Sequence, residues 1–387
     1  MNRSSLGFSP LSLLIREEIL RFGPVPFPWF MDQALYHPQH GYYRKPRRRI
    51  GREGDFYTNV SVGSAFGQIL AAQIVEMWSI LGKPHDFEII EQGAEDGQLA
   101  ADILLAIENS PCEFGKLTYT IVEPAAEKRT EQQGLLQHRF PEIIQWVATL
   151  SELQAVQGVF VANELLDALP FYLLEYQKNR WHERYVTCSG RDFAFISLPI
   201  LSPALSQAVS NLPAPLHSPY RTEVNLGAQH WIREVSTILQ TGFVLVIDYG
   251  YPQDEYYRAE RMEGTLACYS RHCRTFDPLQ NPGDLDITSH VNFTALAAAA
   301  ESAELHLAGY ADQHHFMVGA TESRLREIER NLSRSDHDQF LRQLNTLMHP
   351  GLMGMAFKYL LLTTESQSPA PSGFRYVREP RLALGIF

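Results

Sequence analysis

Short apolar runs alternate with amphipathic segments through the middle of the chain. Residues 87–92 (FEIIEQ) and 117–124 (LTYTIVEP) are short and apolar, which predicts strands, and 158–170 reads as a strand followed by a turn. Between them, residues 97–109 and 126–140 have apolar positions at helical spacing. This alternation predicts an α/β fold, a doubly wound parallel sheet covered on both faces, with ligands at the carboxyl ends of its strands.

The alternation is interrupted and then resumes. Residues 171–224 read as polar-edged hairpins followed by a proline-rich stretch, which predicts an insertion, and GFVLVIDYG at 242–250 continues the sheet. Apolar segments at 304–316 and 353–364 supply its last strands. The expected organisation is a helical and irregular N-terminal extension (1–60), a core (61–170 and 225–365), a β-rich inserted subdomain (171–224) and an irregular C-terminal tail (366–387).

Composition narrows the class of partner. The chain has 33 Lys and Arg against 44 Asp and Glu, a net charge of −11, which argues against nucleic-acid binding. It has no apolar run long enough to span a membrane. Glu17 and Glu18 in the first apolar segment argue against a signal or transit peptide, and the four cysteines suit a reducing compartment, so we expect a cytoplasmic protein.

A metal site is not predicted. Cys268, His272 and Cys273 form only a partial ligand set, because a fourth ligand and paired CxxC spacing are missing.

The stretch FEIIEQGAEDGQLA at 87–100 is the first strand-to-helix turn. Gly93 and Gly97 allow a tight turn and a close approach of the backbone to a ligand, at the beginning of a helix. A dinucleotide site would need G-x-G-x-x-G, which is absent here.

The acids of this turn select the cofactor. A pyrophosphate about 4 Å from Glu91, Glu95 or Asp96 would cost about 4 kcal/mol at an effective dielectric near 20, of which a helix N-terminus offsets about 0.3–1 kcal/mol. NAD and ATP are therefore disfavoured, whereas the sulfonium and ammonium of S-adenosylmethionine are compatible with acids. Glu123, which closes the second strand, is expected to accept the ribose hydroxyls. The alternative is that these acids are solvated loop carboxylates.

Several motifs in order give the chain a family resemblance. They are FMDQALYHPQHGYY (30–43), GREGDFYT (51–58), the glycine turn, VANELLDALP (161–170), VLVIDYG (244–250) and GDLDITSHVNFTAL (283–296). Together they resemble the MidA family of class I S-adenosylmethionine-dependent methyltransferases. The resemblance implies a class I Rossmann-like fold, S-adenosylmethionine as cofactor and methylation of a protein arginine.

The glycine turn departs from the family pattern E-x-G-P-G-x-G. Ala94 stands in place of the proline and Glu95 in place of the middle glycine. A side chain here needs a backbone φ that non-glycine residues rarely adopt. We expect Glu95 either to contact the ligand near its methionine end or to mark a weakened site. In GDFYT, Asp55 and Tyr57 are expected to close over the cofactor, although Asp55 alternatively caps a helix.

The turn after the strand at 158–163 carries the expected catalytic groups. An arginine guanidinium, with a pKa of about 13.8, stays protonated, so two carboxylates that grip it would orient one nitrogen for methylation. Glu164 and Asp167 are placed for this, and Asn163 could hold substrate or cofactor through its amide. Asp248, with Tyr249, is expected to face the same crevice. Alternatively Asp167 caps a turn and Tyr249 belongs to the core.

Polar residues late in the chain are expected to line the substrate entrance: Asp284, Asp286, His290 and Asn292. Three functions remain open on the sequence alone. They are a protein-arginine methyltransferase with a protein partner, a methyltransferase for another substrate, and a non-catalytic assembly module. A homodimer is compatible with each, and substrate specificity is expected in the insertion at 171–224.

Overall fold

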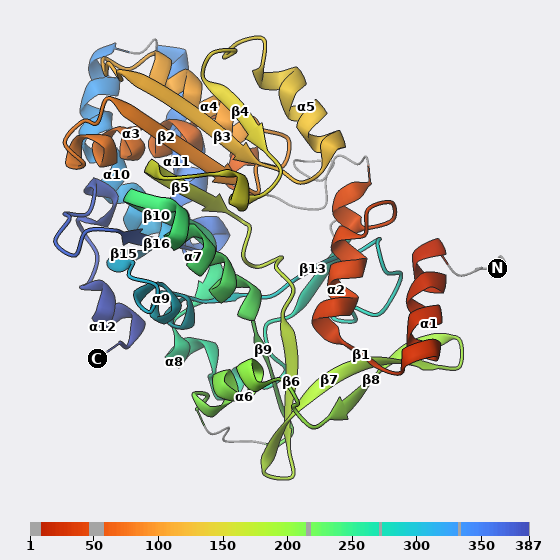
Figure 1. Ribbon diagram of the computed structural model, residues 1–387. Coiled ribbons are helices and arrows are strands. Elements are labelled where there is room, and N and C mark those ends of the chain that lie inside the picture. The colour runs from red at the N-terminus through yellow and green to blue at the C-terminus, as the bar shows by residue number, and fades with distance from the viewer. Residues whose placement is uncertain (1–8, 46–57, 214–217, 271–272, 332–333, 387) are drawn as a thin grey trace. The chain divides into compact units, whose positions relative to one another are not determined.

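The computed structural model describes residues 9–45, 58–213, 218–270, 273–331 and 334–386 (Figure 1). The chain divides into two compact units, each made of three stretches of sequence. The core unit comprises Tyr57–Leu166, Gln229–Gln253 and Val291–Phe387. The accessory unit comprises Met1–Phe56, Asp167–Ala228 and Asp254–His290.

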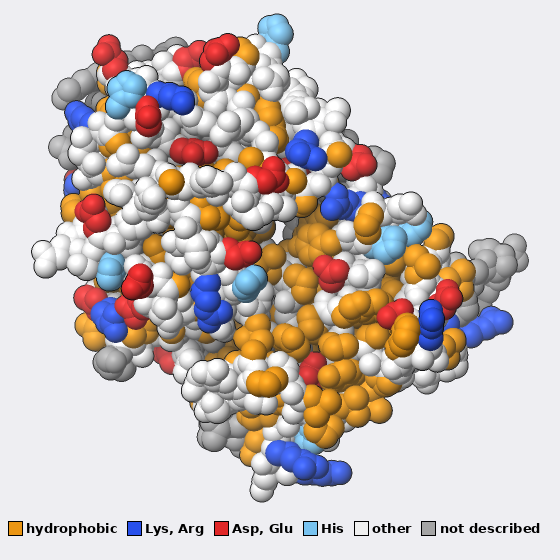
Figure 2. Space-filling view, in the orientation of Figure 1, with side chains coloured by type: hydrophobic (Ala, Val, Ile, Leu, Met, Phe, Trp, Pro, Cys, Tyr) orange, Lys and Arg blue, Asp and Glu red, His pale blue; other side chains and the backbone are white. Residues whose placement is uncertain are grey.

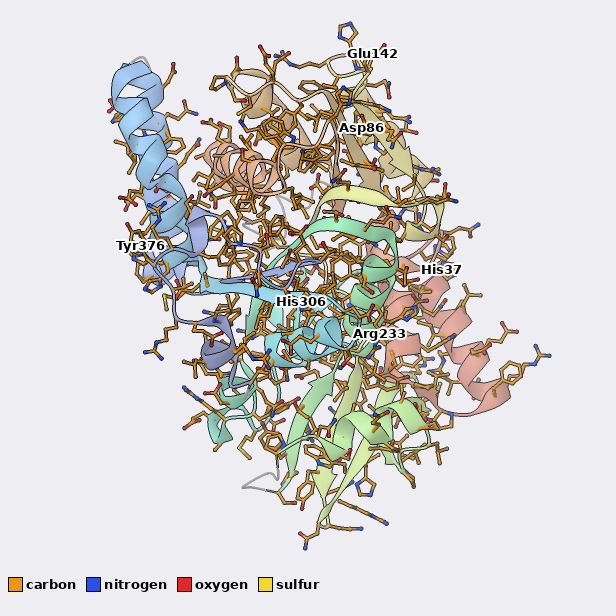
Figure 3. The ribbon with its side chains drawn as sticks, turned by 60° about the vertical axis from the view of Figure 1, so that its left-hand side comes forward. His37, Asp86, Glu142, Arg233, His306 and Tyr376 are labelled. Atoms are coloured by element: carbon orange, nitrogen blue, oxygen red, sulfur yellow. The ribbon has the colours of Figure 1, made fainter. Side chains whose placement is uncertain are left out.

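A mixed eight-stranded sheet forms the centre of the core unit. Its strands in chain order are β2 (Asp86–Gln92), β3 (Lys116–Val122), β4 (Ile144–Val147), β5 (Val156–Asn163), β10 (Leu239–Tyr251), β14 (Val291–Asn292), β15 (His306–Asp312) and β16 (Phe357–Thr363). In space they run β15-β16-β10-β5-β2-β3-β4, with β14 paired to the end of β10. Figure 3 marks the beginnings of β2 and β15 with Asp86 and His306.

The strand order confirms the doubly wound class I methyltransferase-like fold. The first strand of this sheet along the chain is β2. The chain then adds β3 and β4 on one side of β2, and β5 and β10 on the other side, all parallel. The order therefore reverses between β2 and β5, where a doubly wound sheet opens for a ligand. β16 runs antiparallel to both β10 and β15, a feature that the apolar pattern of its sequence does not reveal.

Both faces of this sheet are buried, which explains why its strands read as continuous apolar runs. Phe243, Leu245 and Ile247 of β10 join a cluster on one face, and Val244 and Val246 between them are buried on the other. The helices that contribute to the first cluster are α3 (Ala65–Ile80), α4 (Gln98–Glu108), α5 (Ala126–Leu136), α10 (Gln313–Asn331) and α11 (Arg334–Met348). The opposite face carries α9 (Phe293–Glu301) and the part of α7 (Leu226–Ile238) that follows Ala228 (Figure 1).

Short helical turns complete the core unit: η2 (Val60–Val62), η3 (Leu150–Glu152), η5 (Pro350–Gly354), η6 (Ser372–Phe374) and α12 (Pro380–Leu384).

The C-terminal tail is attached through η6. The amide of Gln73 in α3 donates to Ser372 Oγ (3.0 Å) and accepts from the Gly373 N–H (2.8 Å), and Phe374 packs edge-on against Phe316 of α10. Tyr376, marked beside α10 in Figure 3, donates to Glu322 (2.7 Å). The tail is thus irregular in shape but packed.

The accessory unit contains two antiparallel sheets. The larger runs β1-β7-β6-β9, with β8 on β7, and the smaller runs β12-β11-β13. Their strands are β1 (Val25–Pro26), β6 (Tyr172–Gln177), β7 (Arg180–Ser189), β8 (Asp192–Leu198), β9 (Tyr220–Val224), β11 (Ala267–Ser270), β12 (Cys273–Thr275) and β13 (Asp286–Thr288). The helical elements are α1 (Pro10–Phe22), α2 (Phe27–Tyr36), η1 (Tyr42–Arg44), α6 (Pro203–Ser210) and η4 (Ala259–Arg261), and α8 (Gln253–Tyr256) begins at the boundary with the core unit.

The N-terminal helices pack on the inserted sheet rather than standing apart from it. Phe27 of α2 contacts Phe171 and Phe195, with ring centroids 5.6 and 5.8 Å apart. β1 pairs with β7, which joins the first stretch of the chain to the insertion. Figure 2 shows apolar side chains gathered over α2, β7 and β8 on one face of this unit.

Glu223 of β9 explains why Asp254–His290 belongs with the accessory unit, whereas the sequence analysis placed this segment in the core. Its buried carboxylate accepts hydrogen bonds from the N–H and Oγ1 of Thr265 (3.0 Å each), the Leu266 N–H (3.1 Å) and the Tyr256 hydroxyl (3.2 Å). Burial raises the pKa of Glu223, and these bonds oppose the shift. One side chain thus ties the segment to the inserted sheet.

Candidate active site at the carboxyl edge of the core sheet

The turns that follow β2 and β5 meet at the point where the strand order reverses. Gln92 pairs with Ala162 at the ends of the two strands. A Cβ built on Gly93 would lie 3.4 Å from Leu165 Cδ1, so the two turns are in contact. Of the predicted site residues, the structure brings together at this edge those of the glycine turn, Asn163, Glu164 and Asp248.

The glycine turn uses three left-handed residues to lead into α4. Gly93, Glu95 and Gly97 have φ values of +87°, +48° and +86°. The Gly97 N–H donates to the Ala94 carbonyl (2.7 Å), and Asp96 Oδ1 accepts from the Gln98 N–H (3.1 Å), which starts the helix. Glu95 therefore does adopt the conformation that normally favours glycine.

The Glu95 side chain turns toward α5. Its carboxylate forms an ion pair with Lys128, and its backbone carbonyl accepts from Gln132 Nε2 (2.9 Å). Neither of the two roles expected for Glu95 includes this contact. The sequence signal that could have suggested it is the i, i+4 spacing of Lys128 and Gln132 on one face of the next helix.

Glu91 lies beneath the turn rather than at its surface. It is buried, and its Oε2 accepts a 2.7 Å hydrogen bond from the hydroxyl of Tyr119 in β3. The pKa of Glu91 is raised to about 7, chiefly by burial and to a smaller extent by the nearby Asp96, while the Tyr119 bond opposes the shift. Sequence reasoning missed Tyr119, because the pairing depends on the register of β2 against β3.

Glu123 follows directly after β3, at the same edge of the sheet. It is buried, and its Oε1 accepts from the Ala125 N–H (2.8 Å), which fixes the turn toward α5. Its role in holding the ribose stays a prediction.

Asn163 and Glu164 end β5. Asn163 is 8% exposed, its Nδ2 donates to Glu164 Oε1 (3.2 Å), and its Oδ1 has no hydrogen-bond partner among the described residues. Glu164 has a φ of +51°, and its N–H donates to the Ile247 carbonyl (2.9 Å). Strained backbone of this kind collects at functional sites, and a buried unpaired oxygen requires a partner.

Asp248 of β10 holds the turn that carries Glu164. It is fully buried, with Oδ2 accepting from the Leu166 N–H (2.9 Å) and Oδ1 from the Tyr249 N–H (2.8 Å). Both oxygens are thus engaged by backbone donors, which is the geometry of a positioning residue rather than of a group that touches substrate. The ring of Tyr249 packs on that of Phe357, with 4.1 Å between the ring centroids, and Tyr249 lies against the core cluster.

Several other predicted site residues belong to the accessory unit. Asp167 and the Asp284–His290 loop belong to the accessory unit, where the Tyr43 hydroxyl donates to Asp286 (2.8 Å) and Lys45 to Asp284 (2.8 Å). The Asp167 carbonyl accepts from the Ser289 N–H, and both Asp167 and Asp286 raise the pKa of Tyr43, after the larger effect of burial.

Asn292 caps α9 in the core unit by accepting from the Ala295 N–H (3.0 Å). Asp55, Tyr57 and His272 lie outside the described residues. The roles predicted for them remain predictions.

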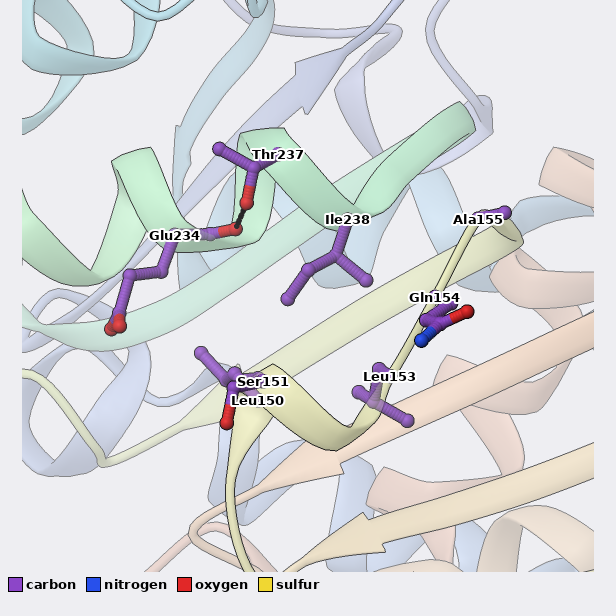
Figure 4. Close-up of a pocket in the computed structure, with 8 residues that line it drawn as sticks. All are labelled: Leu150, Ser151, Leu153, Gln154, Ala155, Glu234, Thr237 and Ile238. Carbon is purple, nitrogen blue, oxygen red and sulfur yellow. Dashed lines mark hydrogen bonds between the residues drawn. The ribbon is translucent and has the colours of Figure 1, made fainter.

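A cavity of about 360 Å³ lies at the other edge of the sheet, where β5 and β10 begin (Figure 4). Its lining residues are Leu150, Ser151, Leu153, Gln154, Ala155, Glu234, Thr237 and Ile238. None of them belongs to the candidate site, so the site is defined by strand ends and unpaired polar atoms rather than by this cavity.

Comparisons with known proteins identify the family of the chain. The family of S-adenosyl-L-methionine-dependent methyltransferases matches residues 69–311, which is more than half of the chain. The chain belongs to this family. A crystal structure from Burkholderia thailandensis with bound S-adenosylhomocysteine has 30% sequence identity, a TM-score of 0.85 and 96% coverage of both chains.

The similarity to curated relatives extends over most of the methyltransferase. The Drosophila melanogaster protein arginine methyltransferase NDUFAF7 homolog, mitochondrial, is 26% identical over 93% of this chain and 86% of its own length. The human protein arginine methyltransferase NDUFAF7, mitochondrial, is 25% identical over 96% and 88%. These relatives are named as mitochondrial proteins, so the expectation of a cytoplasmic protein was wrong. No helix within the described residues is long and apolar enough to cross a membrane.

The candidate site fits S-adenosylmethionine, the cofactor of the family. The φ of +87° at Gly93 favours glycine, so the turn carries no side chain at this point of the strand end. Asp96, which accepts from the Gln98 N–H, keeps a carboxylate in the turn, where a phosphate would meet like charge. Gly93, Gly97 and Glu123 are the residues that would surround it, and Glu91 supports the turn from beneath.

Proposed function

We propose that this methyltransferase modifies an arginine side chain of a protein, with Asn163 and Glu164 as the residues that orient the guanidinium. The observation that carries the proposal is a buried amide oxygen, Asn163 Oδ1, that has no hydrogen-bond partner within the part of the chain that the structure describes. Its amide nitrogen is bonded to the Glu164 carboxylate, so both groups lie at the switch point of the sheet. Relatives named as protein arginine methyltransferases support an arginine as the acceptor.

The chemistry of the acceptor explains the choice of side chains. A guanidinium presents five N–H donors and no acceptor, so it needs oxygen atoms around it. Asn163 Oδ1 accepts one N–H and the Glu164 carboxylate accepts others, which localises positive charge near the acid and leaves one nitrogen directed at the methyl group. When bound, S-adenosylmethionine supplies that methyl group on a positively charged sulfur. The nitrogen that gains the methyl group releases one proton, which the Glu164 carboxylate accepts.

The rigidity of β5 and β10 serves orientation. Asp248 fixes the backbone at Leu166, and the Ile247 carbonyl fixes the Glu164 N–H, so the turn is held from two points. Positioning is the main catalytic contribution when the reacting nitrogen must lie about 3–3.5 Å from carbon. Asp248 thus acts through Glu164 as a positioning residue.

The accessory unit is proposed to recognise the protein that carries the arginine. The insertion at 171–224, where substrate specificity is expected, lies within this unit. A protein acceptor rather than a nucleic acid agrees with the net charge of −11. Size-exclusion chromatography with light scattering tests the further expectation of a homodimer.

The proposal is tested in two stages with the full chain. Calorimetry measures binding of S-adenosylhomocysteine, and tritiated S-adenosylmethionine then reports methyl transfer to proteins of a mitochondrial extract, with mass spectrometry locating the methyl group. We expect binding, labelled arginine, and a loss of about 100-fold in labelling for E164Q. The matched control is E142Q, at an exposed glutamate before β4 (Figure 3). Methyl groups found on lysine or on a small molecule would overturn the arginine assignment.

A further inference from the structure

The glycine turn contains one residue that its conformation does not favour. Glu95 has a φ of +48° between two glycines that also have positive φ values. A side chain destabilises this left-handed conformation, whereas glycine adopts it freely. The turn therefore needs support from outside if it is to keep the shape that the cofactor requires.

Helix α5 provides contacts at three positions on one face. Lys128 pairs with the Glu95 carboxylate, Gln132 donates to the Glu95 carbonyl (2.9 Å), and Leu136 Cδ1 lies 3.1 Å from where a Cβ on Gly97 would stand. These residues are spaced i, i+4 and i+8, so each turn of α5 contacts the glycine turn.

The contacts are sheltered from solvent. Gln132 is fully buried, and its Oε1 is itself fixed by Trp146 Nε1 (3.1 Å). The side chains of Lys128 and Glu95 are 13% and 27% exposed. An ion pair that is largely removed from water is less screened than a pair on an open surface.

We propose that Lys128 is a positioning residue for the cofactor. Its ion pair with Glu95 stabilises the left-handed backbone that a glycine at this position would adopt without support. The inference rests on the proposed function, because it concerns the same cofactor turn. Lys128 neutralises the Glu95 carboxylate and directs it toward α5. The turn then keeps its left-handed backbone at Glu95 and leaves the space beside Gly93 to the ligand.

The test is a double-mutant cycle on the full chain, with the dissociation constant for S-adenosylhomocysteine measured by calorimetry. K128M should raise this constant about fivefold to tenfold, since it removes the positive charge that Lys128 places beside Glu95. E95G removes the need for the pair, so E95G/K128M should bind as E95G does. The matched control is R129M, which removes a positive charge about 100° further around α5 and should bind as the unmodified protein does.

Kinetics separate positioning of the cofactor from a general structural role. K128M should raise KM for S-adenosylmethionine while kcat at saturation stays within about twofold, because uniform binding is lost. Equal binding by K128M and the unmodified protein would overturn the inference and leave the proposed function standing. The inference would also be overturned if K128M weakened binding of S-adenosylhomocysteine as much in the E95G variant as in the unmodified protein. Absence of binding by the unmodified protein would instead count against the proposed function.

Discussion

The hydroxyl of Tyr119 donates a 2.7 Å hydrogen bond to Glu91 across the parallel pair β2 and β3, beneath the cofactor turn. The carboxyl group is buried, and its pKa is raised from 4.5 to about 7 by burial, with a smaller contribution from Asp96. The protonation state of Glu91 is therefore linked to folding in the physiological pH range.

This linkage predicts a pH-dependent stability. Between pH 4.5 and about 7 the folded chain retains a proton on Glu91 that the unfolded chain has released. The free energy of unfolding should therefore fall as pH rises across this window, by about 3 kcal/mol from this group, and Glu91 should add no further change above it. Urea denaturation at pH 5 and pH 8 measures the difference, and E91Q should lower it by about 3 kcal/mol. Glu183, whose pKa is also raised to about 7, should keep its own contribution.

The control for this prediction is E88Q, which changes another acid of β2 and should keep the difference. Y119F provides a second check. The Tyr119 hydrogen bond lowers the pKa of Glu91. Loss of this bond in Y119F should therefore raise that pKa, so that stability continues to fall up to a higher pH. An E91Q protein that shows the same dependence as the unmodified one would contradict the prediction.

Replacement of Glu164 by glycine is expected to raise stability and to abolish activity. Its φ of +51° disfavours any residue with a side chain, so E164G should stabilise the fold by about 0.5–1 kcal/mol. The same change removes the proposed guanidinium contact and should abolish methyl transfer. Thermal unfolding together with the methyl-transfer assay checks both effects. If E164G is neither more stable nor less active, the assignment of Glu164 fails.

Asp248 is expected to act on both the fold and the rate. D248A leaves the N–H groups of Leu166 and Tyr249 without their acceptors, which should cost about 2–4 kcal/mol of stability. D248N keeps one acceptor and should cost less. If Asp248 only positions the turn, D248N should retain measurable methyl transfer, whereas E164Q should lose about 100-fold. A D248N protein as inactive as E164Q but equally stable to the unmodified chain would indicate a direct role.

Gly264 offers a change confined to the accessory unit. Its φ is +82°, and a Cβ there would run into the buried Glu223 carboxylate that holds Asp254–His290. G264A should therefore make this segment sensitive to limited proteolysis at enzyme concentrations that spare the unmodified protein. The affinity for S-adenosylhomocysteine should stay within about twofold, because the cofactor turn lies in the other unit. A large loss of affinity would show that the two units are coupled.

The sequence predicted the parts of the fold that local patterns encode. The strands β2, β3, β5 and β10 follow from short apolar runs, and the glycine turn follows from its place between a strand and a helix. β4 was missed, because its four residues at the edge of the sheet form too short a run. The antiparallel direction of β16 was not predictable either, since a buried strand reads alike in both directions.

The contacts of the site were harder to predict than its residues. The ion pair of Glu95 with Lys128 joins residues 33 apart, and it depends on how α5 packs against the turn. Asp248 was predicted from its place at the end of a strand. That place does not distinguish a carboxylate that faces substrate from one bonded to backbone N–H groups. Such distinctions come from tertiary packing, which a single sequence does not show.

The packed C-terminal tail changes how shortened versions of the protein should be designed. Removal of residues 366–387 would take away two hydrogen-bond partners of the Gln73 amide, Ser372 and Gly373, and would uncover Phe316 on α10. A tail that looks dispensable in the sequence is thus part of the packed surface of the core unit. An affinity tag placed after it leaves these contacts intact, whereas a truncation before Ser372 should yield an aggregation-prone protein.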